Sequence, residues 1–398
     1  MKENKWLNGA LPAILIHGSI GSVYAWSTLA PSIANRFGKS DLIVQIAFSL
    51  AIFFLGMSAA FGGRLVERNI HVSSRVSLGF FCGGLLLTAL SIHVNSIALF
   101  YLGYGAIMGI GLGTGYLTPV KTLMLWFKDN KGLATGIAVC AFGFANTIAA
   151  WLNNYLINHY SLEQTFIYLA IIYLIPMFIA SWLLKKPSWW KEDEVENSNF
   201  KMMSMWKDKN FRKIWLVMFI NIASGLALIS VAKTLMINTN TEHPNSVQIN
   251  PVLVVSIMGI FNGLGRLVIA TISDKLKKRI DIYRYITMFE ALAVIFTIGK
   301  TNPAITFIAL CVIAAGYGAG FSCLPSLLSD IYGSKNISKI HGLSLTSWAI
   351  AGLVGPIFIS NVTNYTTVAT TLYVVYIVAE WIAERVKYVN YTTADQEK

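Results

Sequence analysis

Long apolar stretches separated by short polar segments dominate the chain. Most of these stretches have the 18 or more residues that a helix needs to cross a hydrocarbon core about 30 Å thick. Twelve can be counted, and the pattern therefore predicts an all-α integral membrane protein with 12 transmembrane helices. Their expected ranges are 7–30, 42–61, 76–93, 97–126, 133–154, 162–184, 214–237, 252–272, 285–298, 304–328, 342–362 and 368–387.

One polar segment, 185–213, is much longer than the other breaks and divides the twelve stretches into six and six. The second half repeats features of the first. GTGY at 113–116 is matched by GAGF at 318–321, and KGL at 131–133 by HGL at 341–343. Repetition over six helices is typical of transporters that bind substrate between two halves. We expect an N-terminal six-helix bundle (1–184), a cytoplasmic linker (185–213) and a C-terminal six-helix bundle (214–398), related by pseudo-symmetry.

The composition supports a membrane location. Of the 398 residues 55% are hydrophobic and 13% charged, about half the charged share of a soluble protein, and the mean hydropathy is +0.59. The net charge of +12 arises mainly on one side. Three of the 31 Lys and Arg fall on expected outer loops (Arg36, Lys39 and Lys300), three lie within spans, and the rest fall on inner segments. By the positive-inside rule both termini are cytoplasmic, and the charge does not indicate a nucleic-acid partner.

Other functional classes lack their motifs. The four cysteines and six histidines have no metal-ligand or disulfide spacing, and no GxxxxGK[ST] loop for nucleotide phosphates occurs. We therefore expect no enzyme, metal, cofactor or nucleotide-driven pump. Acids are also scarce: only Glu290 and Glu380 fall at membrane depth. This scarcity favours transport of anions over transport of cations.

One cation lies deep in an apolar stretch. Arg266 precedes Asp274, at the inner end of its span, by eight residues, which is about 12 Å along a helix. That is farther than an arginine can snorkel, and a charge at such depth normally faces a bundle interior or a wet cavity. Arg266 could bind an anion, or it could pair structurally with backbone carbonyls or with Glu290.

The inner loops after the second and eighth stretches resemble the loop motif of the major facilitator superfamily. The matching residues are Gly63, Glu67 and Arg68 in the first loop and Asp274 and Lys275 in the second. The first loop departs from the motif in having Glu67 where Asp is usual, and each loop lacks a later glycine. The resemblance implies that these loops act as gates; alternatively, their charges serve only solvation and topology.

Within that superfamily the chain resembles the oxalate:formate antiporter family over nearly its whole length. The densest match is the window 109–144, GIGLGTGYLTPVKTLMLWFKDNKGLATGIAVCAFGF. Further matches are YAWS at 24–27, NGLGRL at 262–267, SDK at 273–275 and AGLVGP at 351–356. The combination of glycine-tyrosine-proline, tryptophan-phenylalanine and lysine-glycine-leucine elements within one window is a specific signal.

The family resemblance implies a substrate site. The arginine of its eighth helix pairs with the substrate carboxylate and maps onto Arg266, whose planar fork suits a carboxylate. Aromatic walls map onto Tyr24, Trp26, Tyr116, Tyr317 and Trp348. The family's oxalate exchanger has a second cation, a lysine, in helix 11; the corresponding position here is Trp348. Unless Lys121 or Lys233 compensates, rather than snorkelling to an interface, a single arginine suits a monocarboxylate better than oxalate.

We thus predict a secondary active transporter of small organic anions resembling formate, oxalate, lactate or pyruvate, working by alternating access as an exchanger with monocarboxylates preferred. The expected surroundings are the lipid bilayer of the plasma (inner) membrane, where the chain is multi-pass and a functional monomer. A proton-linked monocarboxylate symporter and a transport-dead receptor on the same fold remain alternatives. His17 in the first stretch could be a proton site or a packing residue.

Overall fold

The computed structural model describes residues 4–62, 69–127, 131–188, 201–298, 302–333, 337–362 and 364–388, and every regular element in these ranges is helical. The first group of elements is η1 (Trp6–Ala10), α1 (Leu11–Ile20), η2 (Gly21–Ala25), α2 (Trp26–Phe37), α3 (Asp41–Phe61), α5 (Ile70–His93), α6 (Ile97–Phe100), η3 (Tyr101–Ile107), α7 (Met108–Trp126), α8 (Lys131–His159) and α9 (Leu162–Leu183). The second is η4 (Met202–Lys207), α10 (Lys209–Glu242), α11 (Pro251–Leu264), η5 (Gly265–Ile269), α12 (Ala270–Ser273), α13 (Asp281–Ile295), α14 (Pro303–Tyr332), α15 (Ile337–Ser344), α16 (Thr346–Asn361) and α17 (Tyr365–Glu384).

Asparagine side chains start several of these helices. Asn69, Asn250 and Asn364 each accept hydrogen bonds from two backbone N–H groups of the following turn. These N–H groups have no partner inside the helix, so the caps satisfy them. Helical structure pairs backbone groups within each segment, which is what a hydrocarbon environment requires.

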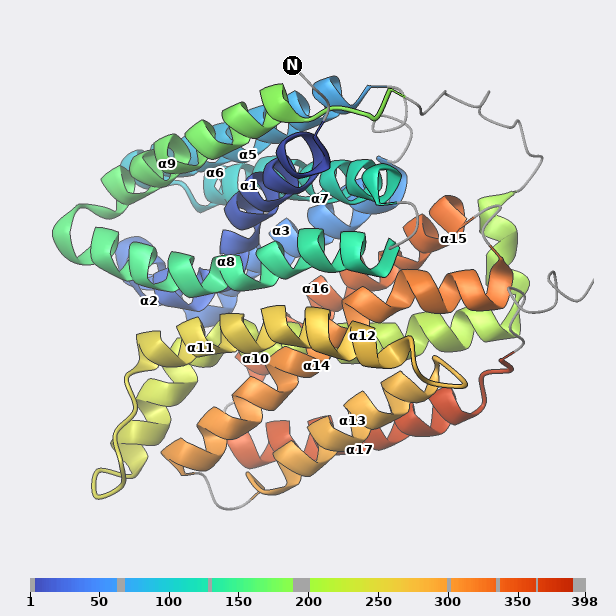
Figure 1. Ribbon diagram of the computed structural model, residues 1–398. Helices are drawn as coiled ribbons and strands as arrows, with labels where there is room; N and C mark the ends of the chain where they lie inside the picture. The colour runs from blue at the N-terminus through green and yellow to red at the C-terminus, as the bar shows by residue number, and fades with distance from the viewer. Residues whose placement is uncertain are drawn as a thin grey trace, which may run out of the picture.

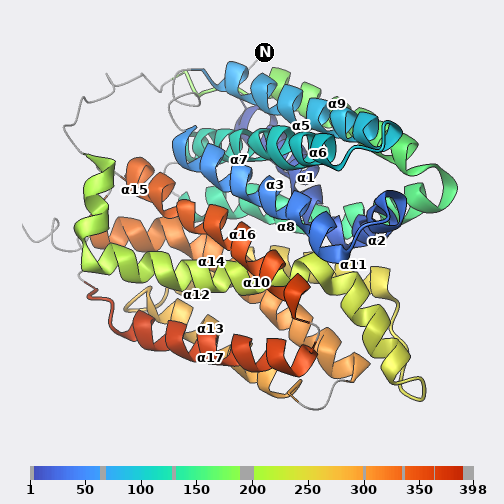
Figure 2. The same cartoon turned by 180° about the vertical axis from the view of Figure 1, so that it is seen from behind.

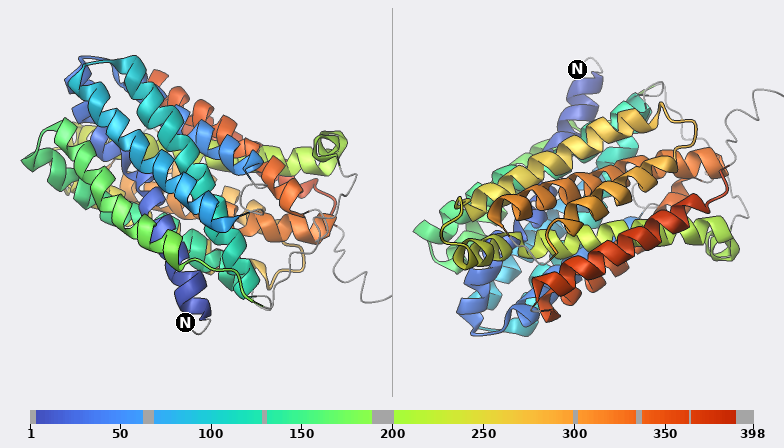
Figure 3. Two further views of the ribbon diagram at one scale, coloured as in Figure 1. Left: turned by 90° about the horizontal axis from the view of Figure 1, so that it is seen from above. Right: turned by 90° about the horizontal axis from the view of Figure 1, so that it is seen from below.

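The helices run side by side as one elongated bundle (Figures 1 and 3). Elements up to α9 lie together on one side and elements from α10 onward on the other. The two groups meet where α8 packs against α11 (Figure 1) and where α3 packs against α16, a contact visible from behind (Figure 2). Substrate sites of two-part carriers lie at such a junction.

Among the described residues, ten helices are long and apolar enough to cross a membrane. Two of the twelve predicted spans do not belong to this set, and the structure shows why. The stretch 7–30 is helical but broken into π, α and 3₁₀ pieces, and α13 in the stretch 285–298 has only 15 residues. Helix ends also extend beyond their apolar cores: α10 has 34 residues, and Asp208 caps its polar start by accepting from Phe211 N.

Candidate substrate-binding site

Arg266 lies in a π-helical turn, η5, that continues α11. Two glycines allow this turn to lie directly against α14. A Cβ on Gly265 would be 2.2 Å from the Ala315 carbonyl oxygen, and a Cβ on Gly318 would be 2.2 Å from the Asn262 carbonyl oxygen and 3.1 Å from Arg266 Cγ. Any larger residue would push the helices apart. Single π turns often occur at functional positions, where they shift the direction of a side chain.

The guanidinium of Arg266 is fully buried. Its Nε donates to Asn262 Oδ1 (2.9 Å) and its Nη1 to the Val139 carbonyl (3.1 Å), whereas Nη2 has no hydrogen-bond partner. The charge lies 5.4 Å from the ring centres of both Phe142 and Phe321, within cation–π range. In the described part of the chain no carboxylate forms an ion pair with it, so the charge is left without a counter-ion.

Aromatic rings from both groups of helices surround this charge. Tyr24 of η2 and Tyr317 of α14 share a hydroxyl–hydroxyl hydrogen bond across the junction. Tyr116 of α7 lies 5.2 Å from Trp348 of α16, ring centre to ring centre, and Phe321 of α14 lies 4.5 Å from Trp348. The indole N–H of Trp348 is buried and has no hydrogen-bond partner.

We call Arg266 and these rings the central cluster. Its members are Tyr24, Tyr116, Phe142, Arg266, Tyr317, Phe321 and Trp348. Two of its donors, Arg266 Nη2 and Trp348 Nε1, are free, and its rings exclude water. These two donors suit a small anion that accepts a hydrogen bond from each. The bond to the cationic donor is the stronger one, and the dry aromatic surroundings strengthen it further.

Glu290 does not pair with Arg266. It is buried on α13, accepts from Asn221 Nδ2 (3.2 Å), and its carboxyl lies against Gly316 of α14. The side chains of the adjacent α14 residue, Tyr317, and of Arg266 belong to the central cluster instead. Backbone carbonyl pairing, the other structural alternative, is present for one of the three guanidinium nitrogens.

Two predicted site residues, Trp26 and Lys233, do not join the central cluster. Trp26 stacks on Phe48 (5.8 Å between ring centres), lies 4.8 Å from the tilted ring of Tyr104, and donates to Gln45 Oε1 (2.7 Å). Lys233 Nζ donates to the Thr28 carbonyl (3.4 Å) between α10 and α2. The side chain of Lys121, like the gating residues Gly63, Glu67 and Arg68, lies outside the described residues.

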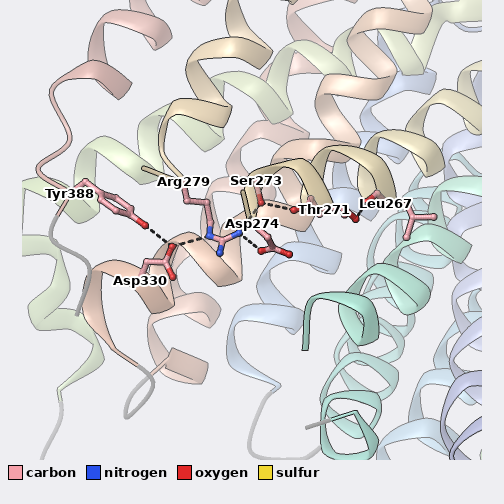
Figure 4. Close-up of polar contacts among 8 residues, drawn as sticks. Leu267, Thr271, Ser273, Asp274, Arg279, Asp330 and Tyr388 are labelled. Carbon is pink, nitrogen blue, oxygen red and sulfur yellow. Dashed lines mark hydrogen bonds and ion pairs between the residues drawn. The ribbon is translucent and has the colours of Figure 1, made fainter. Parts of the chain in front are cut away.

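The predicted gating residue Asp274 belongs to a hydrogen-bonded network at one end of α14 (Figure 4). Arg279 donates from Nη1 to Asp274 Oδ1 (2.6 Å) and from Nε to Asp330 Oδ2 (2.8 Å), and Tyr388 donates to the same Asp330 oxygen (2.7 Å). Burial acts to lower the pKa of Arg279, but the bonds to both aspartates raise it. Burial, followed by the bond to Asp330, raises the pKa of Tyr388 to about 12. Lys275 is exposed.

We expect Asp330→Asn to lower the thermal stability of the purified protein. The change removes the charge that Arg279 and Tyr388 share, and a half-buried guanidinium that loses such a partner costs about 2 kcal/mol. Thermal unfolding in detergent measures the effect. Lys275→Gln, in the segment that carries Asp274 and Arg279 but exposed, is the matched control and should change stability by less than about 0.5 kcal/mol. Equal stability of both variants would contradict a structural role for the network.

Sequence reasoning did not select Phe142, Phe321 or Asn262. The internal repeat contained a signal for Phe321, since GAGF aligns it with Tyr116 of GTGY. In the structure these two repeat-related rings contact Trp348 from the two groups of helices. Phe142 lies in the window 109–144 but carries no polar group, so nothing in the sequence distinguished it from a packing residue.

An apolar helical bundle with an unpaired cation at the junction of its two groups defines a multi-pass membrane transporter. Residues 13–356 match the model of the Major Facilitator Superfamily, and the chain belongs to that superfamily of transporters. The predicted superfamily resemblance is thereby confirmed.

Individual relatives are distant but span most of the chain. The chain is 27% identical to the "Uncharacterized MFS-type transporter YhjX" of Escherichia coli over 366 residues, covering 88% of this chain and 87% of that one. It is 26% identical to the "Oxalate:formate antiporter" of Oxalobacter formigenes over 367 residues, covering 88% and 83%. A crystal structure of the superfamily transporter FucP in the outward conformation matches with a TM-score of 0.65 at 14% identity, covering 94% and 99%, and supports the fold alone.

Proposed function

We propose that the protein is a secondary active transporter of small organic anions, working mainly as an exchanger. The observation that carries this proposal is the fully buried Arg266 guanidinium, which has a free Nη2 and no carboxylate partner among the described residues. Burying an unpaired charge at membrane depth is costly. A bound anion neutralises the charge and reduces that cost, so closure of the two groups of helices is favoured when substrate is present.

The proposed substrates are monocarboxylates such as formate, lactate or pyruvate. Arg266 is the one cation whose described side chain lies in the central cluster, and its remaining free donor together with Trp348 Nε1 can hold one carboxylate. The similarity to an oxalate:formate antiporter supports carboxylates as a class. The remaining expectations belong to the same proposal: 12 spans in two six-helix halves, cytoplasmic termini, a plasma-membrane location and a monomer.

Counterflow in proteoliposomes tests the proposal. Vesicles loaded with formate, oxalate, lactate or pyruvate are assayed for uptake of the same labelled acid, with protein-free vesicles as the control. Uptake that requires an internal carboxylate would establish an exchanger and identify its substrate. Binding of a carboxylate without any counterflow would indicate a receptor, and uptake that requires only a proton gradient would indicate a symporter.

We expect Trp348→Lys to shift preference from monocarboxylates toward oxalate. The substitution places a second cation next to Tyr116 and Phe321, both of which contact Trp348, and a dianion then meets two fixed charges. The ratio of oxalate to lactate uptake should rise about tenfold, the effect of about 1.4 kcal/mol of added selectivity. Trp26→Lys, at an aromatic site outside the central cluster, is the matched control. An unchanged ratio in Trp348→Lys would separate Trp348 from the substrate.

A further inference from the structure

His17 has an arrangement of hydrogen bonds that a neutral histidine cannot satisfy. It is fully buried on α1. Its Nδ1 lies 2.5 Å from the Ala138 carbonyl oxygen of α8, and its Nε2 lies 3.0 Å from the Tyr116 carbonyl oxygen of α7. Both partners can only accept. A neutral imidazole has one N–H donor, so one nitrogen lone pair would face a carbonyl oxygen, whereas the imidazolium donates to both.

The rings around His17 also favour its charged form. The imidazole stacks on the Tyr116 ring, with 5.4 Å between centres and 10° between planes, and Phe142 meets it edge-on at 5.8 Å. A cation over an aromatic face is stabilised by the ring quadrupole. Two features act against the charge: the complete burial of the ring and the electrostatic repulsion of Arg266.

The charged groups around His17 make its affinity for a proton depend on whether an anion is bound. Among the described side chains, α7 presents Tyr116, α8 presents no charged group at this contact, and η5 presents the positive charge of Arg266. The acid of α9, Glu163, is engaged by His93 at 3.2 Å. Arg266 is therefore the charge that opposes a proton on His17, and an anion bound at Arg266 cancels that opposition.

We propose that His17 is a proton-binding site that fills together with the transported anion, giving the central cluster a second positive charge when a dianion occupies it. This inference rests on the proposed function and deepens it. Proton and anion each raise the affinity for the other, because the coupling free energy between two sites is reciprocal. A dianion such as oxalate attracts the proton more strongly than a monoanion such as lactate does. Selectivity between the two thus depends on pH, without a lysine in α16.

Counterflow tests the inference. Uptake of labelled oxalate and of labelled lactate is measured in parallel from about pH 5.5 to about pH 7.5, the range in which histidine titrates. In the wild type the ratio of oxalate to lactate uptake should fall with rising pH, approaching tenfold per unit where one further proton enters with oxalate. His17→Gln should remove this slope. His71→Gln is the matched control, since the His71 ring bonds one carbonyl, that of Ser181, away from the central cluster.

Each outcome separates the inference from the proposed function. A wild type that exchanges lactate with a pH-independent oxalate-to-lactate ratio overturns the inference alone, and this measurement does not depend on the folding of a variant. A sloping ratio that persists in folded His17→Gln also overturns it. A wild type that exchanges none of the carboxylates overturns the proposed function, and the inference with it. A slope present in the wild type and in His71→Gln but absent in His17→Gln supports the inference.

Discussion

Replacing Arg266 with glutamine should reduce carboxylate counterflow by about a hundredfold while leaving the folded protein at least as stable. Removing one partner of a buried charge pair costs about 3 kcal/mol of binding, which corresponds to that loss. The empty protein, by contrast, buries a guanidinium whose Nη2 has no partner. A neutral amide reduces that cost. Counterflow and thermal unfolding in detergent, measured on the same preparation, check both parts.

The pair of measurements distinguishes a ligand-binding arginine from a structural one. If Arg266 mainly joins Val139 and Asn262, the glutamine variant should lose stability and keep its transport. Arg266→Lys retains the charge but lacks the planar fork, and should therefore recover only part of the activity. Lys39→Gln removes an exposed positive charge and controls for a general effect of net charge. Intact counterflow in Arg266→Gln would remove the main support for the proposed function.

Gly143→Val should reduce transport about thirtyfold by separating α8 from α11. A Cβ at Gly143 would lie 2.8 Å from the backbone N and Cα of Gly263 across the junction, and 2.7 Å from Asn262 Oδ1, which holds Arg266. Backbone atoms cannot rotate away as a side chain can, so the helices must move. Overpacking of this kind costs about 2 kcal/mol, enough to depopulate the closed arrangement by that factor.

Gly83→Val on α5 is the matched control for this prediction. A Cβ at Gly83 meets no atom within 4 Å, so the substitution adds the same side chain to a membrane helix without a clash. Exchange should remain within about twofold of wild type, as expected for a substitution that disturbs no packing. If both variants transport equally well, close approach of α8 and α11 is not a step in the transport cycle.

The sequence was sufficient for the depth of Arg266 but not for its surroundings. Arg266 precedes the polar end of its apolar stretch, Asp274, by eight residues, which predicted that its side chain could not reach the interface. The structure buries it completely. Its hydrogen-bond partner Val139 is 127 residues away in the chain. No local pattern specifies such a pairing, because it depends on how α8 and η5 are brought together.

The sequence predicted only part of the aromatic wall, because the orientation of each ring also depends on how the helices pack. Tyr24 and Trp26 belong to one sequence element, YAWS, but only Tyr24 joins the central cluster. Residues two apart in a helix point about 200° apart, so a helix that directs one toward a site directs the other away. The 3₁₀ segment η2, which ends between them at Ala25, alters their directions further. Sequence similarity identified the element, but it could not give the rotation of the helix.

What the sequence by itself determined is the kind of protein: apolar stretches of membrane-spanning length, few charged residues, and a cation deep within one of those stretches. Each follows from solvation, which acts on residues one at a time along the chain. Only the tertiary structure decided which groups meet that cation. The carbonyls facing both nitrogens of His17, the tyrosine pair joining η2 to α14, and the rings flanking Trp348 come from separate helices. Their meeting depends on the rotation and close approach of those helices, which packing fixes and local sequence does not.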